Sequence, residues 1–155
     1  MNAIAAHAVE LRILTHQPEP MVTWWAALLG STPRSLGSRA TIVTTDALQV
    51  VIETSHIALD YHPEASGVTA ISLIVGDAPT ARHALSRVAE LNCQPYRVTQ
   101  VAGVMRFWLH DPNGTDVAVC LPSPTVGADP EVDARPEELE VRTALAHLGH
   151  EERRS

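Results

Sequence analysis

The pattern of hydrophobic and polar positions predicts one order of elements that occurs twice along the chain. In the first half, Ala8–Thr15 alternates apolar and polar residues as a half-buried strand does. Met21–Leu29 is apolar enough for a buried helix. Pro18 and Pro20 precede it, and the first turn of a helix tolerates proline. Gly30 is placed to end the helix. Two further strands are predicted, at Ala40–Thr45 and Leu48–Thr54.

The same order returns after a polar connector, Ser55–Gly67. Val68–Val75 reads as a strand, and Pro79–Asn92 is an amphipathic helix with its apolar residues on one side. Three more strands are predicted, at Tyr96–Val101, Val104–His110 and Asp116–Leu121. The first half therefore reads strand, helix, strand, strand, with one more short strand allowed, and the second half reads strand, helix and three strands. The order repeats after roughly 55–60 residues. We expect one domain, residues 1–122, made of two modules near 8–54 and 68–121.

The residues after this domain differ in composition. Residues 123–155 begin with a stretch rich in Pro, Gly and acidic residues, which is typical of a linker. Glu137–Leu148 is predicted to form a short C-terminal helix, because acidic residues lead it, apolar residues recur along it and Gly149 follows it. The sequence leaves open whether this helix docks on the domain, docks on a partner or frays.

Charge and cysteine content narrow the choice of partner and compartment. The chain has a formal net charge of −7 and no Lys/Arg-rich run before its last few residues, which argues against binding to nucleic acid or to an anionic membrane surface. Cys93 and Cys120 form no C-x-x-C motif and are expected to be small apolar fillers. The first residues lack the features of a signal peptide, and no apolar run reaches the ~18 residues of a membrane span. We therefore expect a cytoplasmic protein with no membrane or nucleic-acid partner.

Three motifs, taken in order, resemble a known family. Thr15–Gly30 contains a strand end, an acidic proline turn, the aromatic pair Trp24-Trp25 and a Leu-Leu-Gly ending. Val75–Asp77 precedes the second helix, and Phe107–Gly114 has aromatic residues followed by Asp-Pro-Asn-Gly. Together they resemble the vicinal oxygen chelate (VOC) superfamily, of the glyoxalase, bleomycin resistance protein and dihydroxybiphenyl dioxygenase type. The resemblance implies an α+β fold in which paired βαβββ modules form curved mixed sheets around a shared cavity.

The resemblance also implies four ligand positions for a divalent metal, one in the first and one in the last strand of each module. In this chain they fall at Glu10, at Val51 or Glu53, at Ala70 and at Ala118. Such sites use nitrogen and oxygen donors, because an open octahedral metal needs them, and the side chain of alanine has neither. Two donors are missing and a third depends on the register, so we expect no metal and no other cofactor.

Alternation along the strands defines a candidate ligand-binding site. Side chains two positions apart share a face, so Glu10, Arg12 and Glu53 are expected on the face of the ligand positions. Two interpretations are open: these residues form a salt bridge at the rim, or Arg12 binds an anionic group of the ligand through bidentate hydrogen bonds from its guanidinium. Ser72 and the alanines at 70 and 118 follow the same alternation.

Aromatic and imidazole side chains complete the expected cavity lining. Trp108 is expected to stack on the ligand and His110 to line the cavity as a hydrogen-bond donor, acid or base, with a solvent-facing strand end as its other reading. Trp24 and Trp25 are adjacent on a helix, so one is expected in the core and the other at the cavity or a dimer contact.

Three functions fit these features. The first is metal-independent binding of a hydrophobic or aromatic small molecule, in the manner of bleomycin-type resistance proteins, by a homodimer with closed symmetry. The second is a VOC-type enzyme, a lyase, isomerase or dioxygenase, with a weak metal site or a metal-free acid–base pair drawn from Glu10, Glu53 and His110. The third is a non-catalytic partner subunit. A fold does not choose among them.

Overall fold

The structure, a computed structural model, describes residues 9–37, 40–58, 69–122 and 136–150. The chain divides into two compact units, residues 1–62 with 111–114, and residues 63–110 with 115–155. The linker predicted at 123–135 lies outside the described residues. No helix in the described ranges has the length and apolar content that a membrane span requires.

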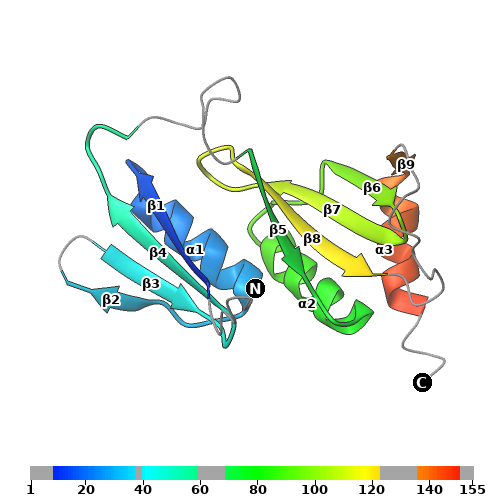
Figure 1. Cartoon of the computed structure of the whole chain (residues 1–155), viewed down its shortest axis with the longest axis horizontal. Helices are drawn as coiled ribbons and strands as arrows, with labels where there is room; N and C mark the ends of the chain where they lie inside the picture. Colours follow the sequence, from blue (N-terminus) through cyan, green and yellow to red (C-terminus); the bar gives the residue numbers. More distant parts are fainter. Residues whose placement is uncertain (1–8, 38–39, 59–68, 123–135, 151–155) are drawn as a thin grey trace, which may run out of the picture. The chain divides into compact units, whose positions relative to one another are not determined.

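The first unit contains one helix and a four-stranded mixed sheet (Figure 1). Its elements are β1 (Val9–Thr15), α1 (Pro18–Leu29), β2 (Arg34–Leu36), β3 (Ala40–Thr44) and β4 (Leu48–Thr54). The strand order is β1-β4-β3-β2; β1 is parallel to β4, and the other neighbours are antiparallel. β2 is the additional short strand that the sequence of the first half allowed.

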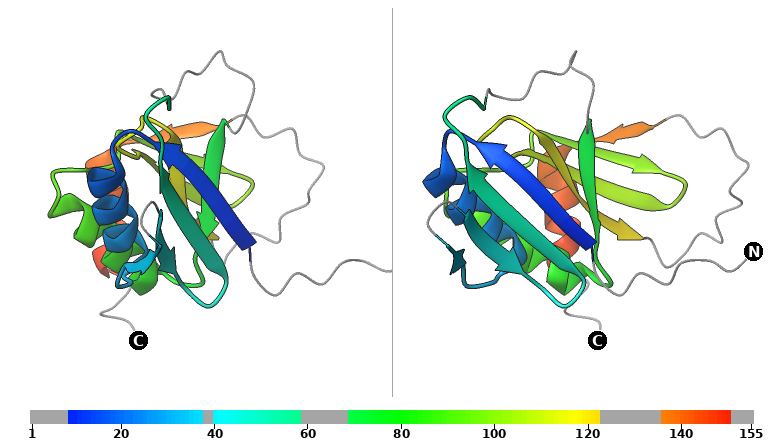
Figure 2. Two further views of the ribbon diagram at one scale, coloured as in Figure 1. Left: turned by 90° about the vertical axis from the view of Figure 1, so that its left-hand side faces the viewer. Right: turned by 60° about the vertical axis from the view of Figure 1, so that its left-hand side comes forward.

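Helix α1 covers one face of this sheet (Figure 2) because one of its sides is wholly apolar. Its core side chains are buried, as are the strand residues on the covered face: Met21, Trp24, Trp25 and Leu28 from the helix, and Val43, Val50 and Ile52 from the sheet. The helix ends as the sequence predicts. Gly30 adopts φ +63°, a left-handed conformation that glycine reaches without steric cost, and its N–H bonds the carbonyl of Ala27.

The second unit repeats the order with a five-stranded mixed sheet. Its elements are β5 (Ala70–Ile74), α2 (Ala78–Ala89), β6 (Arg97–Val101), β7 (Val104–His110), β8 (Asp116–Pro122), β9 (Glu137–Leu139) and α3 (Val141–His150). The strand order is β5-β8-β7-β6-β9, and β5 is parallel to β8 as β1 is to β4. The α+β class with two mixed sheets is therefore confirmed.

Both helices of this unit lie on one side of its sheet, where α2 contacts β8 and α3 contacts α2 and β6 (Figure 1). The buried side of α2 is apolar, with Ala81, Ala84, Leu85 and Val88. One face of the sheet matches it, since its side chains are apolar and at most 1% exposed: Val98, Phe107, Leu109, Val117 and Val119. We assign this face to the helices, and the opposite face carries the polar and aromatic residues considered below.

The expectation for the C-terminal segment was partly wrong. Glu137–Leu139, predicted as the first turn of a helix, is strand β9, which pairs with the edge of β6. The helix begins at Val141 and runs past Gly149 to His150. Glu140 separates the two elements, because its carboxylate accepts hydrogen bonds from the backbone N–H groups of Arg142 and Thr143 and so caps the helix. Ala144 and Leu148 are buried, so α3 packs within this unit.

Candidate functional site

The face of the second sheet turned away from α2 and α3 holds the candidate site, and we call it the Trp108 face. Cross-strand pairing fixes its members, because directly paired residues point to the same side. Ser72 pairs with Ala118, and Ala118 pairs with Trp108. Arg97, which pairs with Trp108, extends this row. The other members lie on either side of it: Ala70, Asp116 and His110 in one direction, and Ile74, Cys120, Arg106, Thr99 and Glu138 in the other.

Trp108 lies at the centre of this face in a fixed orientation. Its indole Nε1–H donates a 2.9 Å hydrogen bond to the hydroxyl of Thr99. Ala118, its cross-strand partner, has no exposed surface, whereas Ser72 on the next strand is exposed. A ring held by its polar edge next to small residues leaves an aromatic surface beside short side chains, which suits contact with a flat apolar ligand.

His110 belongs to a compact cluster at one end of the face. Its Nδ1 lies 3.0 Å from a carboxylate oxygen of Asp116, and the hydroxyl of Tyr96 donates to the same oxygen at 2.9 Å. The rings of Tyr96 and His110 stack with centroids 4.2 Å apart. Burial, and secondly the hydrogen bond to Asp116, raise the pKa of Tyr96 to about 12, so this hydroxyl stays protonated as a donor. The sequence had singled out His110 but neither of its partners.

Arg106 is another residue of this face that the sequence did not single out. It lies on β7 two residues before Trp108, between Cys120 on β8 and Thr99 on β6. Its Nε atom is buried without a hydrogen-bond partner. Burial also raises the pKa of the neighbouring Cys120 thiol, which is therefore a neutral group. The spacing along the strand could have identified it, because side chains two positions apart, at 106, 108 and 110, point to one face.

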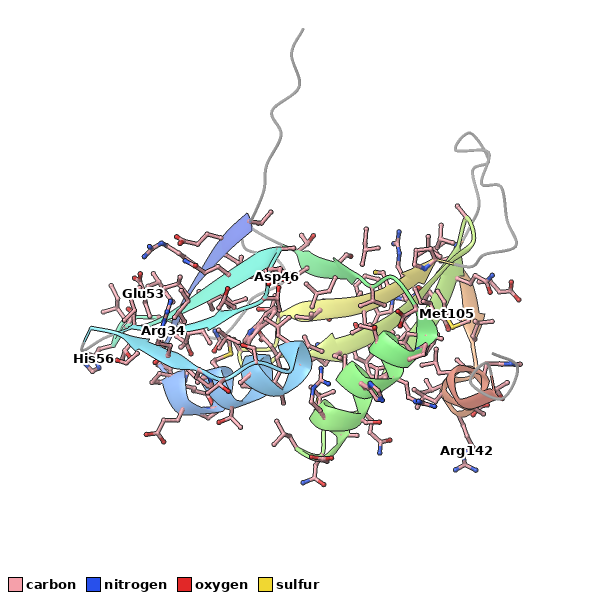
Figure 3. All side chains as sticks on the ribbon, turned by 90° about the horizontal axis from the view of Figure 1, so that it is seen from below. Arg34, Asp46, Glu53, His56, Met105 and Arg142 are labelled. Atoms are coloured by element: carbon pink, nitrogen blue, oxygen red, sulfur yellow. The ribbon has the colours of Figure 1, made fainter. Side chains whose placement is uncertain are left out.

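Glu10, Arg12 and Glu53 come together on one face of the first sheet. The Arg12 guanidinium donates to Glu10 at 2.7 Å and also to Glu53, and Gln49, which the sequence analysis did not name, donates to Glu10 at 2.6 Å. The two carboxylates, Glu10 first, raise the pKa of Arg12. Figure 3 shows Glu53 on the side of this sheet away from α1. All three charged side chains are at least one-third exposed, as in a rim salt bridge, so the cluster adds little stability.

The residues at the implied metal positions do not fit a divalent metal. Arg12 pairs with Val51 as Ser72 pairs with Ala118, and Arg12 and Ser72 each lie six residues before the first residue of their helix. This register makes Val51, not Glu53, the counterpart of Ala118. Glu10 is then the one donor among the four positions, and it already bonds Arg12 and Gln49. Over the described ranges, no three His, Cys, Asp or Glu side chains are grouped to hold a metal ion.

The tryptophan pair of α1 has a structural role. Trp24 and Trp25 are 4% and 0% exposed, and their rings meet edge to face with centroids 5.3 Å apart. Both therefore fill the core of the first unit, although the sequence assigned only one of them to a core. Tryptophan volume, not helical phase alone, decides this, because an indole reaches the core from a flanking position.

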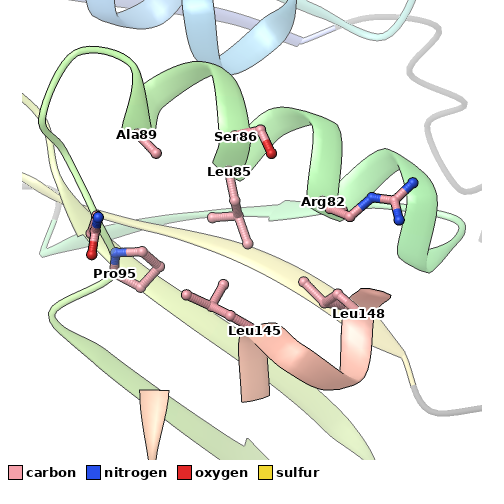
Figure 4. A pocket seen from close by; sticks show the side chains of 8 residues that line it. Arg82, Leu85, Ser86, Ala89, Pro95, Leu145 and Leu148 are labelled. Carbon is pink, nitrogen blue, oxygen red and sulfur yellow. The ribbon is translucent and has the colours of Figure 1, made fainter. Parts of the chain in front are cut away.

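A separate pocket of about 240 Å³ lies on the helix side of the second unit, between α2 and α3 (Figure 4). Apolar side chains make up much of its wall, with Arg82 at one end: its lining is Arg82, Leu85, Ser86, Ala89, Gln94, Pro95, Leu145 and Leu148. This pocket is on the opposite side of the sheet from Trp108, so the two positions can be told apart by experiment.

Comparison with known proteins identifies the fold. No protein-family model matches the sequence, and no curated protein matches it either. Among solved structures, the chain is similar to a glyoxylase/bleomycin resistance protein/dioxygenase domain from Frankia sp. EAN1pec (TM-score 0.60, 12% identity, 82% of this chain and 98% of that one). It is also similar to a glyoxalase/bleomycin resistance protein/dioxygenase from Alicyclobacillus acidocaldarius (TM-score 0.59, 12% identity, 74% and 90%) and to a lactoylglutathione lyase from Agrobacterium tumefaciens (TM-score 0.53, 14% identity, 72% and 90%). At these sequence identities the similarity establishes the fold but not the activity, which has to be argued from the residues of the site.

Proposed function

We propose that this chain, which has the fold of the VOC proteins, is a metal-independent protein that binds a hydrophobic or aromatic small molecule. The binding surface is the Trp108 face, and the role is sequestration, as in bleomycin-type resistance proteins. One observation carries the proposal: the indole of Trp108 is fixed by Thr99 beside the small residues Ala118 and Ser72. Stacking on such a ring contributes about 0.5–1.5 kcal/mol beyond the burial of apolar area.

The donors that the chain offers support the proposal of metal independence. Three of the four implied ligand positions are Val51, Ala70 and Ala118, whose side chains have no nitrogen or oxygen. The fourth, Glu10, has its carboxylate oxygens engaged by Arg12 and Gln49. A guanidinium therefore neutralises the carboxylate that a metal ion would otherwise need.

We propose further that the protein works as a cytoplasmic homodimer, in which Glu10, Arg12 and Glu53 form a salt-bridge cluster on the first sheet. Arg12 is saturated by two carboxylates, so its contribution is to orient them rather than to bind an anion. The exposed apolar side chains that remain on the first sheet, Val9, Leu14 and Leu36, supply surface for contact between copies.

The binding proposal is tested with an uncharged aromatic probe after treatment with a chelator. N-phenylnaphthylamine fluoresces on entering apolar sites, and we expect saturable one-site binding to chelator-treated protein. Replacement of Trp108 by Leu should weaken this binding about tenfold or more, which corresponds to about 1.4 kcal/mol. Stoichiometric Mn, Fe, Ni or Zn in the purified protein, or binding that needs an added metal, would contradict the proposal.

A second candidate, a metal-free acid–base enzyme, is favoured by one specific observation. Asp116 holds Nδ1 of His110 at 3.0 Å, an arrangement that fixes the ring and leaves Nε2 as the atom for proton transfer. Glu10 and Glu53, the other candidates for this role, both accept hydrogen bonds from Arg12, so their carboxylates are already engaged.

Nitrobenzisoxazole tests this candidate, because a general base opens the ring by taking its carbon-bound proton while the N–O bond breaks to give a phenolate. We expect the His110→Gln variant to lose most of any enzymatic rate and Asp116→Asn to reduce it. His83→Gln, on α2, is the matched control. Equal rates in the His110 and His83 variants would remove the enzyme candidate.

A further inference from the structure

We infer that Arg106 makes the Trp108 face selective for an aromatic ligand that carries an anionic group, such as a carboxylate or a sulfonate. This inference rests on the proposed function and defines its ligand class. Arg106 and Trp108 are two residues apart on β7 and point to the same side. With a rise of about 3.3 Å per residue, their Cα atoms are about 6.6 Å apart, roughly the length of one substituted ring.

The other charged groups of this face are already paired. Arg97 forms a 3.0 Å ion pair with Glu138, and His110 lies 3.0 Å from Asp116. Over the described ranges, no carboxylate lies within 4.0 Å of the Arg106 guanidinium. Arg106 therefore leaves a positive charge at the centre of the sheet surface without a counter-charge from this part of the chain.

The surroundings of Arg106 offer its N–H groups little. Its buried Nε has no hydrogen-bond partner, and an unsatisfied buried donor is costly. The hydroxyl of Thr99, on the neighbouring strand, accepts the bond from Trp108, and the Cys120 thiol is directed to the carbonyl of Ala118. An incoming carboxylate or sulfonate would accept hydrogen bonds at two points from the outer N–H groups of the planar guanidinium.

The anion needs an aromatic body to bind here. Trp108 lies beyond Arg106 in one direction along β7, and Ile74, which is 77% exposed, lies in the same cross-strand row as Arg106 and Cys120. These side chains give the ligand apolar contact along β7 and across the sheet from the charge. Because the whole chain has a net charge of −7, a simple inorganic anion gains no attraction from the rest of the protein.

Two probes with one aromatic skeleton test this inference. Anilinonaphthalenesulfonate is the anionic counterpart of N-phenylnaphthylamine, and both are titrated by fluorescence into the full chain. We expect Arg106→Gln to weaken binding of the sulfonate roughly 10- to 100-fold, the loss of a charged hydrogen-bond donor. Binding of the uncharged probe should change less than about twofold, which also shows that the variant folds. The affinity of Arg106→Lys for the sulfonate should lie between those of the wild type and Arg106→Gln, since lysine keeps the positive charge but lacks the paired N–H donors of the guanidinium.

The matched control is Arg142→Gln, which removes the same charge from a residue that points away from α3 into solvent (Figure 3). It should leave both affinities unchanged. If Arg106→Gln weakens both probes equally, or neither, or if Arg142→Gln has the same effect, the anion selectivity is overturned. If the wild-type chain binds neither probe, the proposed function itself fails. If the wild-type chain binds the uncharged probe but not the sulfonate, the proposed function stands and this inference is overturned.

Discussion

At the scale of residues, the Trp108 face shows what alternation predicts and what it leaves out. The register places Ser72, Trp108 and Ala118 in one row, as alternation along each strand requires. Arg106 follows from the same alternation, but the motif near the turn draws attention to aromatic and imidazole side chains rather than to an arginine. The partners of His110 could not be found from the sequence, since Tyr96 and Asp116 reach it only through strand pairing.

The first prediction concerns Ala118, whose replacement by Phe should abolish binding of N-phenylnaphthylamine. Because Ala118 has no exposed surface, the larger ring must displace Trp108, and we expect a loss of about 1–3 kcal/mol in unfolding free energy. Ser72→Phe is the companion variant. It adds the same ring at an exposed position of the same row, so it should block binding with little loss of stability in urea titrations. Unchanged binding by both variants would place the ligand elsewhere.

The second prediction concerns the titration of Tyr96. Its signal is isolated by ultraviolet difference spectra of the wild-type protein against a Tyr96→Phe variant. Its pKa should be about 12 in the wild-type protein and lower in Asp116→Asn, because the carboxylate that disfavours the phenolate is gone. The raised pKa means that the folded state holds its proton more tightly. Its stabilising effect is present below the ordinary pKa of tyrosine and is lost as pH rises through about 12. A wild-type titration near 10 would contradict the geometry of this cluster.

At the scale of elements, the periodicity of the sequence predicted the order of strands and helices through Pro122, because each segment has its own pattern and its own stop signal. β9 was missed for a physical reason. Glu-Glu-Leu resembles the start of a helix, and its strand conformation comes from pairing with β6, a tertiary contact that no local pattern encodes. The cluster around Arg12 was anticipated only in part, since Gln49 enters through the parallel pairing of β1 with β4.

The third prediction concerns the capping of the two helices in the second unit. Glu140 caps α3 and Asp77 caps α2, and hydrogen bonds from Thr143 and Thr80 respectively lower the pKa of each carboxyl. Glu140→Ala should speed amide hydrogen exchange in α3 and leave α2 protected, and Asp77→Ala should do the reverse. Since both pKa values are lowered, each capping carboxylate stabilises the folded protein at pH values above the ordinary carboxyl pKa. This stabilisation is lost as pH falls through the pKa of that carboxyl in the folded state. Equal responses of both helices to one substitution would contradict the assignment.

At the scale of the whole molecule, the two sheets follow one plan with different chemistry. Their first and last strands share a register, yet the corresponding pairs are Arg12 with Val51 in one sheet and Ser72 with Ala118 in the other. The first sheet carries a self-neutralised ionic cluster, and the second carries an aromatic surface with one unpaired guanidinium in the described part of the chain. The fold is that of solved structures named as glyoxalases, dioxygenases and bleomycin resistance proteins, and binding is the function that we propose for this chain.

The fourth prediction concerns assembly. The apolar side of α1 is covered by its own sheet, so a dimer would have to use other surfaces. We expect light scattering at micromolar concentration to give about twice the chain mass of 16.7 kDa. A monomer under these conditions would remove the homodimer and leave the binding proposal intact, because the Trp108 face lies within one unit of one chain.

The most direct test of the binding proposal is a nuclear magnetic resonance titration of the chelator-treated protein with N-phenylnaphthylamine. The chain has three tryptophans, and each indole N–H gives its own signal. The indole signal of Trp108 and the amides of β5, β7 and β8 should shift together, while the indoles of the buried Trp24 and Trp25 stay in place. Shifts confined to the pocket between α2 and α3, or to the tryptophans of α1, would contradict a ligand site on the Trp108 face.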